Sequence, residues 1–497
     1  MARARASSSR PGPAREAAFP RPALLSLALP LLAALGLRLW AWSRSSGLTM
    51  DSALYVRMAE DLLAGHRGAS PAHHGYPLLV ALASLILPGR ELPGRAVSLL
   101  MSLALVAVVW GMARRRIGER LAWLPASLVA LHPLLAVYGS AIMTEASFLA
   151  VMGAGLALLE TARPRAGGAL LGAAWWLRPE AALLAPIAVV LAPLRARERV
   201  LALAIAAAVA LPYSVVLRIE QGHWSLTPKS VLVRAPFADA RSAEWRLADT
   251  TAFADTTGID TRLARDGGAI VRAYPSRLAA QLGGVLEAWS APLLLLSLGG
   301  LAFAAGRGAW LALLALPFAY PLLSAPPDLR FAQLTVPALA LAAGGACAAV
   351  RARGVPWRAA AALAALAGLV LTWAGPAGRR ALAFDDGPMT AMRGAGAWIA
   401  AHAGPDAVIM DRKSYVPFFA HRTHVQLPDE SLDVLLRYAK DRGVSHLVVE
   451  EYVVRSLRPQ LAPLLDGGFL AHEPRVRMVY ATRPAPGDGV AVLEVVR

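Results

Sequence analysis

The sequence has few charged residues and a single cysteine. Charged side chains make up 17% of its 497 residues, whereas soluble globular proteins carry about a quarter. The lone Cys347 excludes an intramolecular disulfide. The chain has no Rossmann fingerprint, and residues 376–497 show no nucleophile motif, glycine-rich phosphate loop or metal-ligand spacing. The low share of charged residues argues against an ordinary soluble enzyme. Because residues 376–497 carry no recognisable catalytic motif, candidate catalytic residues are sought in the rest of the chain.

Apolar residues dominate what is present. They form 57% of the chain, with a mean hydropathy of +0.49, and they recur in long runs along residues 22–375. A bilayer crossing needs about 20 such residues. The remainder, residues 376–497, has a soluble composition. The sequence therefore predicts an α-helical polytopic membrane protein with a C-terminal extramembrane domain, and residues 1–21 are expected to be a disordered cytoplasmic terminus.

The net charge of +17 reflects the topology of the chain rather than a nucleic-acid partner. The arginines gather in short clusters between apolar runs, as cytoplasmic loops of membrane proteins do. Placing these clusters inside gives about eleven transmembrane helices with the N-terminus in the cytoplasm. The segments 44–94 and 218–282 become external loops, and the C-terminal domain lies outside.

Two apolar segments do not fit a simple crossing. The run 77–88 has only about a dozen residues, so we interpret it as an interfacial or re-entrant helix on the outer face. The segment 169–194 has arginine clusters on both sides, and a single crossing would break the charge rule once. Two half-spans turning at Leu177-Arg178-Pro179-Glu180 would satisfy the rule, and a proline with two charges suits a turn better than a helix centre. We favour this hairpin.

The C-terminal domain alternates helix and strand patterns. Helical spacing covers 390–403 and 432–440, and short apolar or alternating runs predict strands at 407–410, 446–449, 476–481 and 490–496. A small α/β domain is therefore expected. Tyr415, His421 and His424 could line a surface of it, although a lone histidine in a soluble domain is more often structural.

Four polar stretches share the outer side under this topology. They are the first external loop with Asp51, Tyr55, Arg57, His66, His73, His74 and Tyr76, the run from Tyr138 to Glu145, the turn Arg178-Pro179-Glu180, and the run from Pro326 to Phe331 with Asp328 and Arg330. Acids and arginines that meet at one membrane face suit a site that handles a phosphate and removes a proton.

Each group also has a structural interpretation. An acid just after a span is often only solvated, and Glu145 could simply favour a helix N-terminus. Arg178 and Arg330 could extend to lipid headgroups. The pair His73-His74 suggests a metal, but no third ligand accompanies it at helical or loop spacing. No metal site is therefore predicted, and only the shared side of the other groups favours function.

Several motifs resemble the GT-C glycosyltransferases, most closely the dolichyl-phosphate-mannose protein mannosyltransferase family, whose bacterial members include the aminoarabinose transferase of lipid A. The matching stretches are Asp51–Tyr55, Ala59–Gly65, Gly75–Leu79, Tyr138–Glu145, Leu177–Glu180, and Arg330-Phe331 followed by Pro337. The resemblance covers residues 22–375 as a catalytic module of the GT-C type. The tail resembles, with lower specificity, the exoplasmic domain of many bacterial members.

The resemblance implies transfer of a sugar from a polyprenyl-phosphate donor to a lipid, glycan or protein acceptor at the outer face of a bacterial cytoplasmic membrane. It implies Asp51 as the catalytic base. Many relatives place a second acid directly after the first; here Ser52 stands there, which weakens a metal or paired-carboxylate site and leaves Glu145 as the likelier second acid. Donor phosphate and substrate binding is expected from Tyr55, Arg57, His74, Tyr76, Arg178, Glu180 and Arg330. No cofactor is certain: a divalent cation stays open as an alternative, without support from the ligand spacing.

Two other classes of protein remain as alternatives. A transporter or lipid flippase would also need intramembrane charges and a re-entrant hairpin, but such proteins usually show repeated halves with matched broken helices. We find no such repeat. An assembly protein with an exported tail would not require these acids and arginines to gather on one side. The sequence does not specify the sugar.

Overall fold

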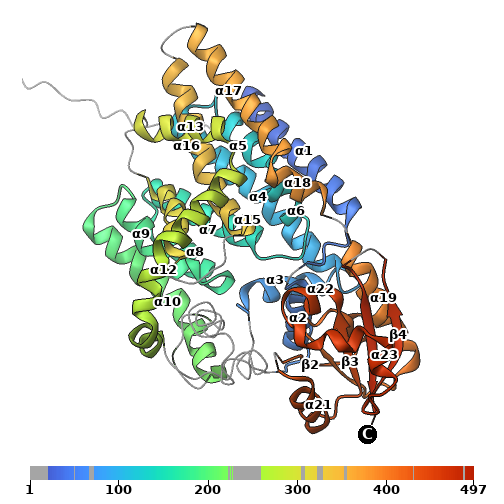
Figure 1. The fold of residues 1–497 in the computed structure, drawn as a ribbon. Coiled ribbons are helices and arrows are strands. Elements are labelled where there is room, and N and C mark those ends of the chain that lie inside the picture. Colours follow the sequence, from blue (N-terminus) through green and yellow to red (C-terminus); the bar gives the residue numbers. More distant parts are fainter. Residues whose placement is uncertain are drawn as a thin grey trace, which may run out of the picture.

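The computed structural model describes residues 21–49, 51–66, 72–221, 224, 227, 259–303, 308–321, 328–351, 355–384, 386–428, 430–484 and 487–496. Residues 1–20 and about half of the expected loop 218–282 lie outside the described residues, and its residues 259–282 are helical, with 271–282 inside a candidate span. The chain forms a long helical bundle with a small sheet domain at one end of it, beside α2 (Figure 1).

Five helical segments of the described chain are long and apolar enough to cross a membrane. They belong to α1 (Arg21–Arg44), α4 (Leu92–Ile117), α10 (Ala196–Gln221), α17 (Val355–Ala374), and the run of α15 (Leu329–Ala332), η3 (Gln333–Thr335) and α16 (Val336–Arg351). A sixth is reached if α12 (Ile259–Ala288) and α13 (Ala291–Phe303), which meet at a bend of 105°, count as one span. The helical multi-pass architecture is confirmed, and the number eleven stays a prediction.

The other helices of the bundle are short, and two of them, α6 and α8, begin at a proline. They are α2 (Ser52–Leu63), α3 (Gly75–Ser84), α5 (Trp123–Ala130), α6 (Pro133–Tyr138), α7 (Glu145–Glu160), α8 (Pro164–Leu177), α9 (Glu180–Leu191), η2 (Ala309–Ala315) and α14 (Leu316–Ala319). Proline fits the first turn of a helix because its missing N–H would be unpaired there in any case. The expected outward span 121–138 is therefore two helices, α5 and α6, separated at Pro133.

The two segments that did not fit a simple crossing are indeed short helices. The expected interfacial segment is α3, with ten residues. The segment 169–194 breaks where expected, because α8 ends at Leu177 and α9 begins at Glu180. Arg178 between them has extended backbone, which the following Pro179 favours. The break is confirmed, while the hairpin and its position in the bilayer stay predictions.

One buried charge in the bundle was not predicted. Arg38 of α1 is fully buried, and its Nε donates to Ser102 Oγ of α4 at 2.6 Å. Its Nη1 donates to the carbonyl oxygen of Ala130 in α5 at 2.8 Å. A charge inside a membrane protein is better tolerated when it is hydrogen-bonded, and here Nε and Nη1 are paired while Nη2 has no partner among the described residues. Arg38 therefore fastens α1 to two neighbouring helices.

The C-terminal domain is a five-stranded sheet with helices, as the sequence predicts. Its strands β1 (Val408–Asp411), β2 (Thr423–Gln426), β3 (His446–Glu450), β4 (Val476–Thr482) and β5 (Val490–Val495) lie in the order β2-β1-β3-β5-β4. Strand β1 pairs in parallel with β2 and β3, and the β3–β5 and β5–β4 pairs are antiparallel. The four strands expected from the sequence are present. The four-residue strand β2 was missed, because its sequence Thr-His-Val-Gln has no marked alternation.

Helices complete this domain. They are α19 (Gly387–His402), α20 (Tyr415–Ala420), α21 (Leu432–Asp441), α22 (Glu451–Ser456), η4 (Pro459–Leu465) and α23 (Gly467–Leu470). The preceding helix α18 (Pro376–Leu382), which the sequence placed in this domain, packs instead against α6 and α17 of the bundle. Helix α20 follows β1 directly and packs against both α19 and α2. The carboxyl ends of the parallel strands β1 and β3 carry Asp411 and Glu450. The segment after β1 therefore lies against α2 of the bundle.

Candidate functional site

Five charged residues from four separate stretches of the chain meet in one cluster. We call this cluster, Asp51, Glu145, Arg178, Glu180 and Arg330, the charged centre. The side chains of Glu145, Arg178, Glu180 and Arg330 are almost fully buried. The sequence predicts that all five share one side of the membrane, which stays a prediction, and the structure links them through ion pairs.

Arg178 joins two of the acids. Its Nη1 donates to Glu145 Oε1 at 2.8 Å and to Thr144 Oγ1 at 3.1 Å. Its Nη2 donates to Glu180 Oε1 at 2.6 Å, and its Nε also faces the Glu180 carboxylate. All three nitrogens of this guanidinium are thus engaged with protein groups. Arg178 holds the start of α7 against the start of α9.

Arg330 joins Glu145 to the third acid, Asp51. Its Nε donates to Glu145 Oε1 through a short contact, and its Nη1 lies 3.7 Å from Asp51 Oδ2. Glu145 Oε1 therefore accepts from both arginines, while the buried Glu145 Oε2 has no hydrogen-bond partner among the described residues. A buried acceptor of this kind is costly unless something else binds it.

The acids of the charged centre stand at helix N-termini, which explains how local sequence places them. Glu145 is the first residue of α7 and Glu180 the first of α9, and Asp51 is the N-cap of α2. A carboxylate is favoured there because the helix dipole is positive at its N-terminus. Asp328, the N-cap of α15, accepts from the backbone N–H of Arg330 at 2.9 Å and so fixes the segment that carries this arginine.

Asp51 does not act as an ordinary helix cap. An N-cap aspartate usually accepts a hydrogen bond from the first turn of its helix, but the Asp51 side chain makes no such bond to the described helix α2. It is turned toward Arg330 and toward Lys413, whose Nζ lies 3.0 Å from Asp51 Oδ1. Its side chain is 16% exposed, against 1% for Glu145 and 5% for Glu180. Asp51 is thus the most accessible acid of the centre.

Tyr55 and Tyr76 lie next to the charged centre and pack on each other edge to face, with ring centroids 5.4 Å apart. Burial, and secondly the charge of Asp51, raises the pKa of the Tyr55 hydroxyl, which therefore stays protonated. Tyr76 donates its hydroxyl to the carbonyl oxygen of Gly94 at 2.9 Å and pairs with Ser98 Oγ at 2.8 Å. These bonds show Tyr76 joining α3 to α4; substrate binding by either tyrosine stays a prediction.

Arg57 and His74 lie outside the charged centre. Arg57 Nη2 donates to the carbonyl oxygen of Arg422 in the C-terminal domain at 3.3 Å. His74 Nε2 lies 3.1 Å from Glu220 Oε1 of α10, and its ring contacts Tyr213. The structure therefore does not bring these two residues to the acids and arginines with which the sequence grouped them.

Two residues of the site were missed from the sequence. Tyr320, at the end of an apolar run, donates its hydroxyl to Glu180 Oε1 at 3.1 Å and packs on Phe331. Lys413 comes from the C-terminal domain, in a segment without any recognisable motif. The only local signal for Tyr320 was a tyrosine at the end of an apolar run. No local sequence signal marked Lys413.

The residue after Asp51 has a structural role. Ser52 is fully buried, and its Oγ donates to the carbonyl oxygen of Ile142 at 2.9 Å. It therefore ties the start of α2 to the segment that leads into α7. Among the described residues, no group of three histidine, cysteine, aspartate or glutamate side chains is arranged to hold a metal ion.

A pair of buried acids lies behind Lys413. Asp411 at the end of β1 and Glu450 at the end of β3 share a hydrogen bond, and both are buried. Burial raises the pKa of both carboxyls above its usual range, and the neighbouring Glu450 raises that of Asp411 further. The pair therefore takes up protons in the folded domain more readily than in the unfolded chain.

This pair makes the stability of the C-terminal domain depend on pH. A raised folded-state pKa contributes stability that is fully present below the unfolded value, about 4 for a carboxyl, and is lost as pH rises through the folded value. We expect the melting temperature of the purified protein to fall between about pH 4 and neutrality. The variant Glu450→Gln should flatten this dependence. Hydrogen exchange of peptides from β1 and β3 across this pH range would measure the stability of the domain. An unchanged pH dependence of this stability in Glu450→Gln would contradict the prediction.

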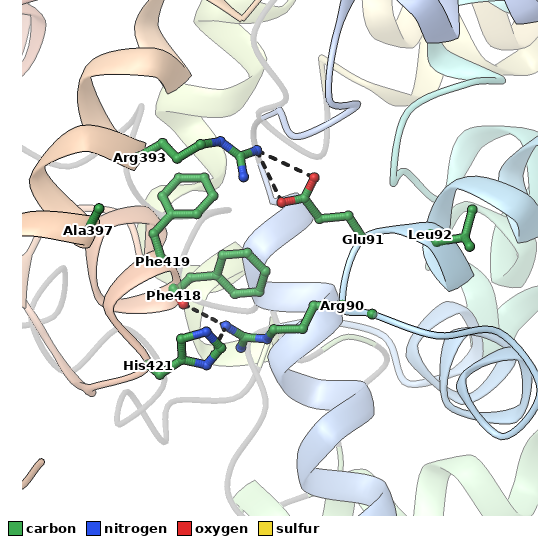
Figure 2. Close-up of a pocket in the computed structure, with 9 residues that line it drawn as sticks. Arg90, Glu91, Leu92, Arg393, Ala397, Phe418, Phe419 and His421 are labelled. Atoms are coloured by element: carbon green, nitrogen blue, oxygen red, sulfur yellow. Dashed lines mark hydrogen bonds and ion pairs between the residues drawn. The ribbon is translucent and has the colours of Figure 1, made fainter. Parts of the chain in front are cut away.

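A cavity of about 450 Å³ lies where the bundle meets the C-terminal domain. Figure 2 shows Arg90 and Glu91, which precede α4, facing Arg393 of α19 and the segment Phe418–His421. Arg90 lies over the Phe418 ring and donates through Nη1 to the Phe418 carbonyl oxygen at 2.6 Å. Arg393 lies over the Phe419 ring and pairs with Glu91 at 3.1 Å. These contacts fasten α20 to the bundle.

Comparisons with known proteins agree with this architecture. The structure is similar to the Archaeoglobus fulgidus oligosaccharyltransferase in its apo form, with a TM-score of 0.55 and 14% identity, covering 87% of this chain and 70% of that one. It is also similar to ArnT from Cupriavidus metallidurans bound to undecaprenyl phosphate, with a TM-score of 0.51 and 14% identity, covering 95% of this chain and 98% of that one. No protein-family model and no curated protein sequence matches the chain.

The fold is thus that of the GT-C membrane enzymes, to which both of these proteins belong. The expected fold class, including the C-terminal sheet domain, is confirmed. At 14% identity the likeness extends to the fold alone. The function must be inferred from the charged centre.

Proposed function

We propose that this protein is a membrane glycosyltransferase that moves a sugar from a polyprenyl-phosphate donor to an acceptor at the outer face of the bacterial cytoplasmic membrane. The acceptor is a lipid, a glycan or a protein. One observation carries the proposal: an accessible carboxylate, Asp51, lies beside a buried guanidinium, Arg330, with Nη1 and Oδ2 3.7 Å apart. A base and a fixed cation within reach of each other are the two groups that this displacement needs.

The proposed reaction is a single in-line displacement. The acceptor hydroxyl oxygen attacks the anomeric carbon, the bond between that carbon and the phosphate oxygen breaks, and the configuration inverts. The leaving polyprenyl phosphate takes the electron pair, and the hydroxyl proton passes to Asp51. Asp51 suits the role of base because it is the most exposed acid of the centre, at 16% of its side chain.

Arg330 is the proposed ligand of the donor phosphate. Negative charge grows on the phosphate as the sugar leaves, and a guanidinium is always protonated and presents a planar set of donors. Arg178 is less free for this role because Glu145, Glu180 and Thr144 engage all three of its nitrogens. We therefore assign Arg178 and Glu180 to holding the centre together.

Glu145 has two proposed roles. Its Oε1 accepts from Arg178 and Arg330, so it orients the guanidinium that meets the phosphate. Its buried Oε2, without a partner among the described residues, is an acceptor suited to a sugar hydroxyl. With 1% of its side chain exposed, Glu145 is less suited than Asp51 to receive the proton of an incoming acceptor.

The proposed orientation places the charged centre and the C-terminal domain outside the cell and the N-terminus in the cytoplasm. It rests on the arginine clusters, which the rule for short loops assigns to the cytoplasm. Arg114, Arg115 and Arg116 form such a cluster in the last turn of α4. Because Asp51 precedes α2 and contacts the C-terminal domain, the two must share one side of the membrane.

The test is transfer of label from polyprenyl-phosphate sugars. Membranes holding the protein would be supplied with a radiolabelled pool of these donors, and the loss of donor and the gain of labelled acceptor would be measured. We expect donor consumption that membranes without the protein do not show. If no polyprenyl-phosphate sugar is consumed, the proposal fails, and transport of a lipid-linked substrate becomes the hypothesis to examine.

A further inference from the structure

The C-terminal domain contributes a side chain to the charged centre. Lys413 lies between β1 and α20, and its Nζ pairs with Asp51 Oδ1 at 3.0 Å across a sequence separation of 362 residues. The Lys413 side chain is 40% exposed and that of Asp51 is 16% exposed. A half-buried pair of this kind adds little to stability, so its position deserves another explanation.

The loop that carries Lys413 is fixed on both sides. The Asp411 side chain accepts from the Val416 backbone N–H at 3.3 Å, which closes the loop on itself. Gln426 of β2 donates through Nε2 to the Arg412 carbonyl oxygen at 2.8 Å. Lys413 therefore stands on a segment anchored to the sheet rather than on a free tail.

The same segment is docked on α2 at a second point. Arg90 donates through Nη2 to Glu60 Oε2 of α2 at 2.6 Å and through Nη1 to the Phe418 carbonyl oxygen of α20 at 2.6 Å. Figure 2 shows this arginine against α20. Asp51 begins α2 and Glu60 lies near its end, so contacts at both ends of the helix hold the C-terminal domain in place.

We propose that Lys413 is a positioning residue of the catalytic centre, an inference that rests on the proposed function. The Asp51 side chain has two alternative orientations. The first caps α2, as an N-cap aspartate normally does, and the second turns toward Arg330, as observed here. The ammonium of Lys413 favours the second, because it holds the carboxylate away from α2 and beside Arg330. The C-terminal domain thereby completes the site.

The variants Lys413→Met and Lys413→Arg separate charge from bulk. Methionine removes the charge on an unbranched chain, and arginine restores the charge. Lys440→Met is the matched control, because Lys440 is exposed on α21 in the same domain. We expect Lys413→Met to lower kcat about tenfold to a hundredfold, the scale of a displaced catalytic group, with KM for the donor changed by less than about twofold. Lys413→Arg should recover most of the rate, and Lys440→Met should match the wild type.

The pH profile distinguishes positioning from a structural effect. Removal of a cation 3.0 Å from the base should move the acidic limb of kcat/KM to higher pH, whereas a general loss of folded enzyme would lower the whole curve. The double variant Asp51→Asn/Lys413→Met should be no slower than Asp51→Asn alone, because Lys413 acts through Asp51.

The outcomes separate this inference from the function on which it rests. A wild-type protein without any transfer overturns the proposed function and the inference together. An active wild type with a fully active Lys413→Met variant overturns the inference alone. The inference is also overturned if Lys413→Met raises only KM, or if it slows the Asp51→Asn variant as much as it slows the wild type.

Discussion

Replacing Asp51 by asparagine is expected to lower sugar transfer by about a hundredfold to ten-thousandfold, the usual cost of losing a general base. The amide has the size of the carboxylate but cannot accept the proton of the acceptor hydroxyl. Asparagine is as good an N-cap as aspartate, so α2 should keep its start. The measurement is the rate of label transfer from polyprenyl-phosphate sugars, alongside binding of the same labelled donors, which should persist.

The matched control is Asp61→Asn on the same helix. Asp61 lies on α2 with 62% of its side chain exposed and pairs only loosely with His66, at 3.8 Å. Asp51→Asn and Asp61→Asn each remove one negative charge at α2. An effect of net charge on membrane insertion, or on the attraction of the polyprenyl-phosphate donor, would therefore appear in both variants. Transfer by Asp51→Asn at the rate of Asp61→Asn would contradict the assignment of the base. Glu145 would then be the next acid to replace.

The charged centre could be predicted from the sequence because its acids stand at breaks between helices. Glu145 and Glu180 follow polar or proline-containing runs inside apolar sequence, and a charge there has few structural alternatives. The charge rule for loops then placed these breaks on one side. The charge rule could not predict which side chains are in contact. Glu145 Oε1 joins Arg178 to Arg330 because helices far apart in the chain pack together.

The residues that were missed or misplaced show the limit of sequence patterns. Lys413 reaches Asp51 only because β1 runs in parallel with β3 and ends at the bundle. His74 and Arg57 follow Asp51 closely in sequence, yet α2 and α3 direct them to α10 and to the C-terminal domain. Residues that are close in sequence lie apart in the structure when the chain changes direction between two helices. Long-range pairing therefore decides which polar groups share the site.

Replacing Arg330 by lysine is expected to lower kcat by about a hundredfold to a thousandfold, the scale for loss of one preorganised donor to a developing negative charge. Lysine keeps the positive charge for Glu145, which limits the destabilisation that an unpaired buried acid would cause. It loses the planar set of donors that lets one guanidinium contact both Glu145 and a phosphate. The donor phosphate carries one negative charge before transfer and gains more as the sugar leaves, so the loss should fall on kcat rather than on KM.

Arg380→Lys provides the matched control for Arg330→Lys. Arg380 pairs with Asp328 through Nη1 and Oδ1 at 2.6 Å, so an arginine–carboxylate pair is altered in the same way outside the charged centre. We expect near wild-type kcat from it, because Asp328 keeps its cap on α15. Single-turnover kinetics with labelled donor would separate binding from the chemical step. If Arg330→Lys raises KM and leaves kcat unchanged, Arg330 binds donor and transition state equally, and the developing charge is met by another group of the centre.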